Sequence, residues 1–268
     1  MTSTGGHERL ALVTGASSGI GEAFAHRLGA LGYDLVITAR REDRLNEVAA
    51  RIEAEHHREV RVIAADLANR EHLARVLEVA AGEPVAMLVN NAGMAHYKPF
   101  LDLPPAEAEE LVLVDALAPT LLARAALPGM VDRGSGAVIN LSSMLAFSGT
   151  VDEPRLPKRA VYAATRAYIV TFSQLLELEL RGTGVYVQAL CPGVVRTEFH
   201  SRQGMDMSNR PRLEPDQVVT ASLLAMEHGE LVCSPTLEDA GLIDRVGEAQ
   251  RALLNPTFSP EPAGRYRG

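Results

Sequence analysis

The chain of 268 residues contains no tryptophan, only 4% aromatic residues and two cysteines, Cys191 and Cys233. Two cysteines without metal-ligand spacing do not support a disulfide framework or a cysteine-bound metal, so we expect no metal site and a reducing, cytoplasmic compartment. With few aromatics, the apolar content of 47% must pack mainly through alanine, valine and leucine. This composition predicts a globular protein.

An excess of positive charge is also missing. The net charge is −8, and lysine is nearly absent, because 24 of the 26 basic residues are arginine and only Lys98 and Lys158 are lysine. An acidic chain of this kind is not suited to nucleic acid or to an anionic membrane. Residues 1–8 lack the features of a signal peptide, and we expect no apolar run of membrane-spanning length.

The length fits one large α/β domain. We expect a flexible segment at residues 1–8, the domain over residues 9–255 and a tail at residues 256–268, which is rich in proline and glycine. No internal repeat or linker interrupts the domain.

A glycine-rich turn follows the first apolar run, which begins at Leu10. Residues 14–21 read TGASSGIG and pass directly into an amphipathic segment over residues 22–31. Gly15, Gly19 and Gly21 lack a Cβ, so the backbone can adopt positive φ and approach a pyrophosphate at the positive end of the following helix. An ordinary strand-to-helix turn is the alternative interpretation.

The second strand is expected at residues 33–38 and its helix at residues 42–55. Arg40 and Arg41 lie between them, where an open parallel sheet meets the adenosine ribose, and arginine there pairs with a 2′-phosphate. This favours NADP over NAD, although a solvated charge pair at a helix start is the alternative. Asp66 and Leu67 follow the third strand, residues 60–65, and Asp66 either contacts the adenine or caps the next helix, near Asn69.

Further strands and helices continue to alternate, which indicates a doubly wound parallel sheet. We expect a strand at 85–89 followed by Asn90-Asn91-Ala92-Gly93, and a long helix over 105–130 that bends near Pro119. The remaining strands are expected at 136–141, 185–190 and 231–234, and the remaining helices at 159–181, 215–228 and 238–255.

Five short motifs occur in a specific order: TGASSGIG, NNAG, Ser142-Ser143, Tyr162 and Pro192-Gly193. Together they resemble the short-chain dehydrogenase/reductase family over residues 8–235. The resemblance implies a Rossmann fold, an NADP(H) cofactor and a homodimer or homotetramer. It implies cofactor contacts at Gly15, Ser17, Ser18, Gly19, Ile20, Gly21, Arg40, Arg41, Asp66, Leu67, Asn91, Ala92, Gly93, Tyr162, Arg166, Pro192, Gly193, Val195 and Thr197.

The resemblance also implies the catalytic groups. Ser143 would hold a substrate carbonyl oxygen and Tyr162 would give it a proton. The family has lysine four residues after the tyrosine, where this chain has Arg166, and asparagine in the preceding long helix, where it has Asp115. We hypothesise that Asp115 and Arg166 form a direct ion pair in place of a water-mediated link. Drift under the bias against lysine is the alternative for Arg166 but does not explain Asp115.

The expected function is interconversion of a carbonyl and an alcohol on a small or medium, partly apolar substrate. A substrate lid is expected over residues 197–212, and residues 152–158 either shape the pocket or form a surface insertion. His96 either lines the site or lies at the surface. Alternatives are a non-redox dehydratase, isomerase or cyclase of the same fold, and a catalytically silent NADP(H)-binding protein.

Overall fold

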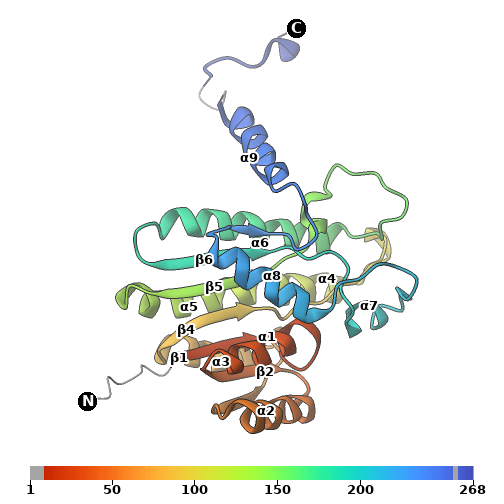
Figure 1. Ribbon diagram of the computed structural model, residues 1–268. Coiled ribbons are helices and arrows are strands. Elements are labelled where there is room, and N and C mark those ends of the chain that lie inside the picture. The colour runs from red at the N-terminus through yellow and green to blue at the C-terminus, as the bar shows by residue number, and fades with distance from the viewer. Residues whose placement is uncertain (1–8, 256–258, 268) are drawn as a thin grey trace. The chain divides into compact units, whose positions relative to one another are not determined.

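The computed structural model describes residues 9–255 and 259–267. These divide into a unit that ends at Pro235 and a smaller one that begins at Thr236. The first unit contains a seven-stranded parallel sheet in the order β3-β2-β1-β4-β5-β6-β7 (Figure 1). This confirms the predicted doubly wound Rossmann fold. The expected segment at residues 1–8 lies outside the described residues, as does part of the tail.

The strands agree closely with the expected apolar runs. They are β1 (Arg9–Thr14), β2 (Tyr33–Ala39), β3 (Val60–Ala64), β4 (Val85–Asn90), β5 (Gly136–Leu141), β6 (Val185–Leu190) and β7 (Val232–Cys233). The helices of this unit are α1 (Gly19–Ala30), α2 (Glu42–His56), α3 (Arg70–Gly82), α4 (Pro105–Val112), α5 (Ala118–Asp132), α6 (Ala160–Glu179), α7 (Glu198–Ser201) and α8 (Pro215–Glu227). Short 3-10 turns lie at Phe100–Asp102 and Met144–Phe147.

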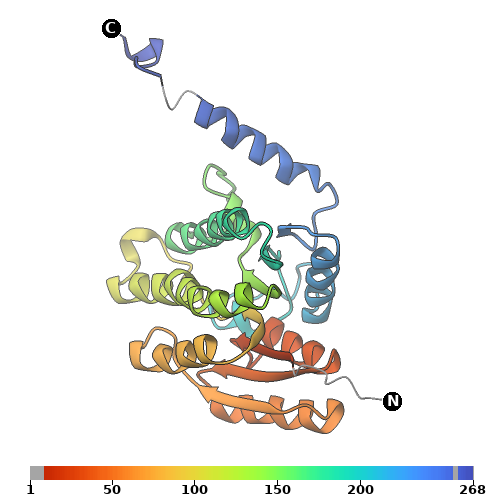
Figure 2. The same ribbon diagram turned by 90° about the vertical axis from the view of Figure 1, so that its left-hand side faces the viewer.

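Helices cover both faces of the sheet (Figure 2). Side chains alternate along a strand, so Ala11 and Val13 of β1 belong to the core under α1, α2 and α8, whereas Leu12 belongs to the core under α3, α5 and α6. Burial on both faces explains why the strands read as continuous apolar runs rather than as alternating patterns.

The strand order reverses between β1 and β4, which pair in parallel near the centre of the sheet. In such sheets a crevice opens at the carboxyl ends of the strands where the order reverses. The glycine loop leaves β1 at this edge and the Asn-Asn-Ala-Gly segment leaves β4 beside it. The topology therefore brings together two motifs that are more than 70 residues apart in sequence.

The long apolar helix contains a π-helical turn at Leu113–Leu117, between α4 and α5. Pro119 has no N–H to donate to the carbonyl of Asp115, and the chain widens instead, so that the N–H of Ala118 reaches the oxygen of Leu113. The expected irregularity near Pro119 thus takes the form of a π-turn just before the proline.

The segment Pro105–Asp132 is long and apolar enough to cross a membrane by length and composition. This corrects our expectation that no apolar run approaches that length. More than half of its most apolar window is buried, and Leu122, Ala126 and Met130 lie in the core under the sheet. A core helix satisfies the same length and composition test.

A buried polar chain ties the central strands to both long helices. Asn90 Nδ2 donates to Asn140 Oδ1 at 2.9 Å and to the Pro119 carbonyl at 3.3 Å. Asn140 Nδ2 donates to Ser173 Oγ, which in turn donates to the Ile169 carbonyl. Asn90, the first Asn of the Asn-Asn-Ala-Gly motif, therefore links neighbouring strands and also fixes α5 and α6 on β4 and β5.

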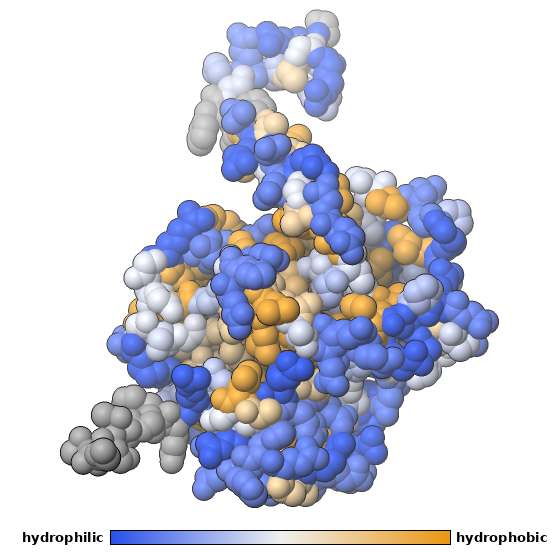
Figure 3. Space-filling model, in the orientation of Figure 1, coloured by the Kyte–Doolittle hydropathy of each residue, from blue (hydrophilic) through white to orange (hydrophobic). Residues whose placement is uncertain are grey.

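Several large apolar side chains of the first unit are exposed. Leu175 and Leu178 on α6 are about half exposed, as is Leu224 on α8, and apolar surface gathers over α8 in Figure 3. Exposed apolar helix faces are typical of subunit contacts. The homodimer or homotetramer nevertheless stays a prediction.

The second unit contains the helix α9 (Gly241–Leu254) and a 3-10 turn at Gly264–Tyr266. No residue of α9 is buried within the described part of the chain. The sequence predicts that the main domain continues to residue 255, whereas α9 belongs to the smaller unit.

Candidate active site

One cavity of about 740 Å³ opens at the carboxyl ends of the strands. It is lined by 19 of the residues that the sequence predicts, which come from segments spread over most of the first unit. They are Gly15, Ser17, Ser18, Gly19, Ile20, Arg40, Arg41, Asp66, Leu67, Asn91, Ala92, Gly93, Ser143, Tyr162, Arg166, Pro192, Gly193, Val195 and Thr197. The volume lies in the range of ligand pockets.

The glycine loop has the backbone that its sequence predicts. Gly15 and Gly19 have φ of 69° and 61°, which residues with a Cβ rarely adopt. Gly21 differs from the expectation, because it does not line the cavity. A Cβ there would collide with the Asn91 amide and the Gly15 carbonyl, so Gly21 allows close packing of α1 against the loop rather than offering a cofactor contact.

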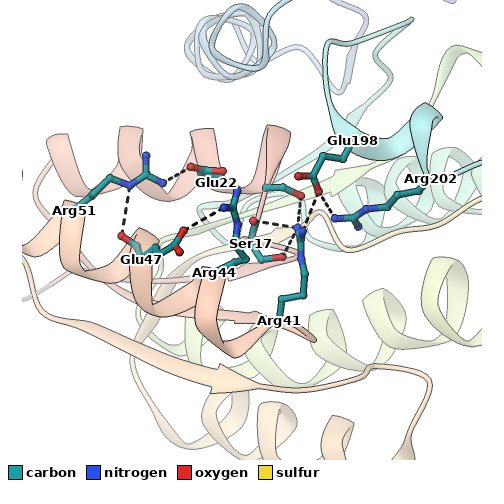
Figure 4. A network of polar contacts seen from close by, with 9 residues as sticks. Ser17, Glu22, Arg41, Arg44, Glu47, Arg51, Glu198 and Arg202 are labelled. Atoms are coloured by element: carbon teal, nitrogen blue, oxygen red, sulfur yellow. Dashed lines mark hydrogen bonds and ion pairs between the residues drawn. The ribbon is translucent and has the colours of Figure 1, made fainter. Parts of the chain in front are cut away.

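Arg41 is the centre of a polar network beside the glycine loop (Figure 4). Its Nη2 donates to the Ser17 carbonyl at 3.2 Å, to Ser17 Oγ at 3.2 Å and to Ser18 Oγ at 3.0 Å. Its Nη1 donates to Glu198 Oε2 at 3.0 Å. The neighbouring Arg40 instead lies 3.6 Å from Glu110. The two arginines predicted to read a phosphate therefore have different surroundings.

Asp66 lines the cavity, and its carboxylate accepts a hydrogen bond from the Ala68 N–H at 3.0 Å. The cap of α3 is Asn69, whose Oδ1 accepts from the N–H groups of Glu71 and His72. Of the two roles considered for Asp66, helix capping therefore belongs to its neighbour.

Ser143 and Tyr162 reach the same cavity from different elements. Ser143 follows β5, and its Oγ accepts from the Leu145 N–H at 3.1 Å, which fixes the side chain at the start of a 3-10 turn. Tyr162 lies in the first turn of α6 and is 5% exposed. Phe199 packs against its ring at 6.1 Å between centroids. The site thus offers two hydroxyl groups at an apolar wall.

Arg166 lies one turn after Tyr162 on α6 and is buried. Its Nη2 is 2.7 Å from Asp115 Oδ2, and its Nη1 donates to the Leu141 carbonyl at 3.0 Å. The guanidinium carbon is also 4.9 Å from the centre of the Tyr162 ring. The structure therefore contains the hypothesised direct ion pair, with the cation between Asp115 and the tyrosine.

Asp115 lies behind the cavity rather than in its lining. The π-turn directs its carboxylate toward the Asn-Asn-Ala-Gly segment, where Oδ1 accepts from the Met94 N–H at 3.0 Å. Burial raises the pKa of Asp115 to about 6, against the opposing effects of Arg166 and the Met94 N–H. Gly93 makes room for the pair, since a Cβ there would lie 2.6 Å from Arg166 Nη2.

His96 is not part of the cavity lining. Its ring nitrogens lie 3.3 Å from Glu107 and 3.5 Å from Glu110. The adjacent Tyr97 lines the cavity instead, and its ring lies edge-on to the Tyr162 ring at 5.3 Å between centroids. Burial raises the pKa of Tyr97, and the neighbouring Tyr162 adds to the rise. Sequence reasoning missed Tyr97 because it belongs to no motif.

The 152–158 loop contributes Arg155, Leu156 and Pro157 to the cavity, which favours pocket shaping over a surface insertion. From the expected lid, Phe199, Met205 and Met207 also line the cavity, together with His200, Arg202 and Arg210. Apolar side chains thus surround the mouth near Ser143 and Tyr162, and arginines are interspersed among them.

Within residues 9–255 and 259–267, ligand atoms at metal-binding distances from one another occur in His26, Glu55 and His56, outside the cavity lining. Burial and the nearby Arg51 lower the pKa of His26. The positive charge of Arg51 opposes metal binding at this cluster, and the expectation of no metal stays untested.

A comparison with known protein families agrees with this site. The family model described as short chain dehydrogenase matches residues 9–207. The chain belongs to this family. Among solved structures, a short-chain dehydrogenase from Sphingobium yanoikuyae in complex with NADPH is 36% identical, with a TM-score of 0.91 and coverage of 96% of this chain and 100% of the other.

A second solved structure, a bulky-bulky ketone specific alcohol dehydrogenase from Comamonas testosteroni, is 31% identical to the present chain. Its TM-score is 0.86, and the match covers 97% of the present chain and 99% of the Comamonas chain. The very-long-chain 3-oxoacyl-CoA reductase of Bos taurus is 36% identical over 193 residues, which are 70% of this chain and 60% of the relative. The chain thus spans less than two thirds of the bovine protein's length.

Proposed function

We propose that this short-chain dehydrogenase is an NADP(H)-dependent oxidoreductase that interconverts a carbonyl and an alcohol. The observation that carries the proposal is the convergence of Ser143, Tyr162 and the glycine loop on one cavity, with the Arg166 guanidinium against the tyrosine ring. The relatives, an alcohol dehydrogenase and an oxoacyl-CoA reductase among them, support the same reaction class.

The cavity fits the nicotinamide cofactor that the family uses. Gly15 and Gly19 leave the loop backbone bare at the start of α1, where N–H groups and the helix dipole favour a pyrophosphate. Arg41, with the Ser17 and Ser18 hydroxyls, supplies groups that suit a 2′-phosphate. We therefore assign NADP(H) rather than NAD(H), and the complex of the Sphingobium relative with NADPH supports this assignment.

When bound, the cofactor would supply or accept a hydride at the substrate carbon. The Ser143 hydroxyl would donate a hydrogen bond to the carbonyl oxygen, and Tyr162 would donate the proton that this oxygen takes up. Arg166 would favour the ionised tyrosine and orient the cofactor. Since a guanidinium does not release its proton, Arg166 would act as a fixed charge and not as a relay.

The substrate that fits is a ketone, or the corresponding alcohol, with apolar groups on both sides of the reacting carbon. Phe199, Met205 and Leu156 come from the lid and the 152–158 loop and line the mouth of the cavity. Methionine packs against ligands of varied shape. The relative that is specific for bulky-bulky ketones supports this substrate class.

A non-redox acid–base role is less well supported. It would use Asp115 as an additional carboxylate, but Asp115 is 1% exposed, lies outside the cavity lining and is engaged by Arg166 and the Met94 N–H. A general acid or base must lie within hydrogen-bond reach of the substrate, directly or through one water, and the position of Asp115 behind the wall weighs against this role.

The test combines binding with turnover. Calorimetric titration should show NADPH binding at least about tenfold more tightly than NADH, as expected for one charge-assisted phosphate contact. NADPH-dependent reduction of bulky ketones should fall by about 10²–10⁴-fold in Tyr162→Phe, with NADPH affinity retained. Tyr168→Phe, on the exposed side of the same helix, is the matched control. Failure to bind either dinucleotide would overturn the proposal in favour of a non-redox protein, and NADPH binding without any ketone reduction would favour a catalytically silent NADP(H)-binding protein.

A further inference from the structure

Arg41 and Glu198 connect two parts of the cavity wall that are far apart in sequence. Arg41 lies between β2 and α2, beside the glycine loop, whereas Glu198 is the first residue of α7 in the lid. Both the Arg41 Nη1 contact at 3.0 Å and a second contact from Arg202 hold the Glu198 carboxylate. Figure 4 shows the carboxylate directed at the two guanidinium groups.

The groups around Arg41 form a site for an anion. The guanidinium contacts the hydroxyls of Ser17 and Ser18 at 3.2 and 3.0 Å, and each hydroxyl can rotate to donate to an incoming oxygen. A carboxylate and a phosphate present similar pairs of oxygens to an arginine. Glu198 therefore satisfies Arg41 in the way that a phosphate oxygen would.

The exposure of the Arg41–Glu198 pair allows another anion to replace Glu198. The side chains of Arg41 and Glu198 are 34% and 45% exposed, so water replaces either partner at little cost, and exposed ion pairs contribute little to stability. A dianionic phosphate would compete well for Arg41, because it carries more charge than one carboxylate.

We propose that Glu198 and the 2′-phosphate of the cofactor compete for Arg41, so that NADP(H) detaches this end of the lid from the glycine loop, whereas NAD(H), which lacks the 2′-phosphate, does not. The inference rests on the proposed use of NADP(H). It makes Glu198 a determinant of cofactor preference: its charge weakens NADPH binding and couples the position of α7 to the presence of the phosphate.

The test compares Glu198→Gln with the wild type in calorimetric titrations. Four ligands are used: NADPH, NADH, adenosine 2′,5′-bisphosphate and adenosine 5′-monophosphate. Removing the competing charge should tighten the binding of NADPH and of the bisphosphate by about three- to fivefold, which corresponds to an exposed ion pair of up to about 1 kcal/mol. NADH and the monophosphate should change less than twofold. Glu177→Gln, an exposed carboxylate paired with Arg181 on α6, is the control and should change none of the four.

Two results would overturn the inference. Equal weakening of NADPH and NADH would show that the Arg41–Glu198 contact clasps the bound cofactor, and unchanged affinities would show that the two anions do not compete. Neither result affects the proposed function, which is tested separately by dinucleotide binding and ketone reduction in the wild type. Because the bisphosphate lacks the nicotinamide, it separates the phosphate contact from effects at Tyr162.

Discussion

Two arginine–carboxylate pairs line or support the same cavity, and their surroundings are opposite. Arg166 and Asp115 have side chains that are 4% and 0% exposed and lie 2.7 Å apart, whereas Arg41 and Glu198 are 34% and 45% exposed at 3.0 Å. Desolvation makes the first pair expensive to form, and solvent makes the second pair easy to separate. The same type of ion pair therefore fixes the helix α6 where it is buried, at Arg166 and Asp115, and can exchange with a ligand where it is exposed, at Arg41 and Glu198.

The buried pair owes its geometry to backbone features rather than to the two side chains alone. The π-turn directs Asp115, Gly93 leaves space for the Arg166 guanidinium, and the Leu141 carbonyl accepts from its Nη1. Arg166 is buried and held by these contacts, unlike Arg41, which solvent can reach. Its position against the Tyr162 ring is thus set before any substrate arrives.

The largest effect should come from removing one arginine at a time. Arg166→Met should lower kcat by at least about 10²-fold, because Tyr162 loses the fixed cation that favours its ionised form, while NADPH affinity changes by much less. Arg41→Met should do the reverse, weakening NADPH by about tenfold or more with kcat at saturation nearly unchanged. Steady-state kinetics and calorimetry on both variants measure this split.

If Arg41→Met lowered kcat as strongly as Arg166→Met does, the two pairs would act as one network and the contrast drawn between them would be wrong. Measurement at saturating cofactor is essential, since weak binding otherwise mimics slow turnover.

The sequence predicted those parts of the site that depend on local rules. Glycines at positive φ, apolar runs buried on both faces and residues at the carboxyl ends of parallel strands all follow from chain geometry, and this is why Gly15, Asn91 and Ser143 were placed correctly at the cavity. The Asp115–Arg166 contact was predicted from the family pattern, which brings those two positions close.

Other features depend on contacts that no local pattern encodes. Arg41 and Glu198 are 157 residues apart, and nothing near either residue indicates the other. Tyr97 lines the cavity, while the adjacent His96 faces two glutamates, and no local pattern separates these two neighbours. The π-turn has a local cause in Pro119, but a proline predicts a disturbed helix without saying whether it bends or widens.

The second prediction concerns pH. Burial raises the pKa of Asp115 from 3.8 to about 6, so the folded protein binds this proton more tightly than the unfolded chain does. The contribution of Asp115 to stability is then complete below about pH 4 and is lost as pH rises through 6. Over this range the unfolding free energy of the wild type should therefore fall relative to that of Asp115→Asn, which has no carboxyl group to titrate at this position.

Urea unfolding of wild type and Asp115→Asn at several pH values between 4 and 7.5 measures this difference. If the difference in unfolding free energy between the two proteins stayed constant with pH, the raised pKa of Asp115 would be contradicted. If the wild type instead gained stability relative to Asp115→Asn as pH rises, Arg166 would more than offset the burial of the carboxylate. Glu198→Gln belongs in the same series as the exposed counterpart.

The smallest effect should be on the exposed pair. Glu198→Gln should change the free energy of unfolding by less than about 1 kcal/mol, and added salt should erase even this change, because solvent and ions screen a pair of this exposure. A loss of about 2 kcal/mol or more that persists in 0.5 M salt would mean that the contact clamps the lid to the core. The Arg41–Glu198 pair would then resemble the buried one, and a phosphate could not displace Glu198 cheaply. A small, salt-sensitive effect is what a contact that exchanges with a ligand requires.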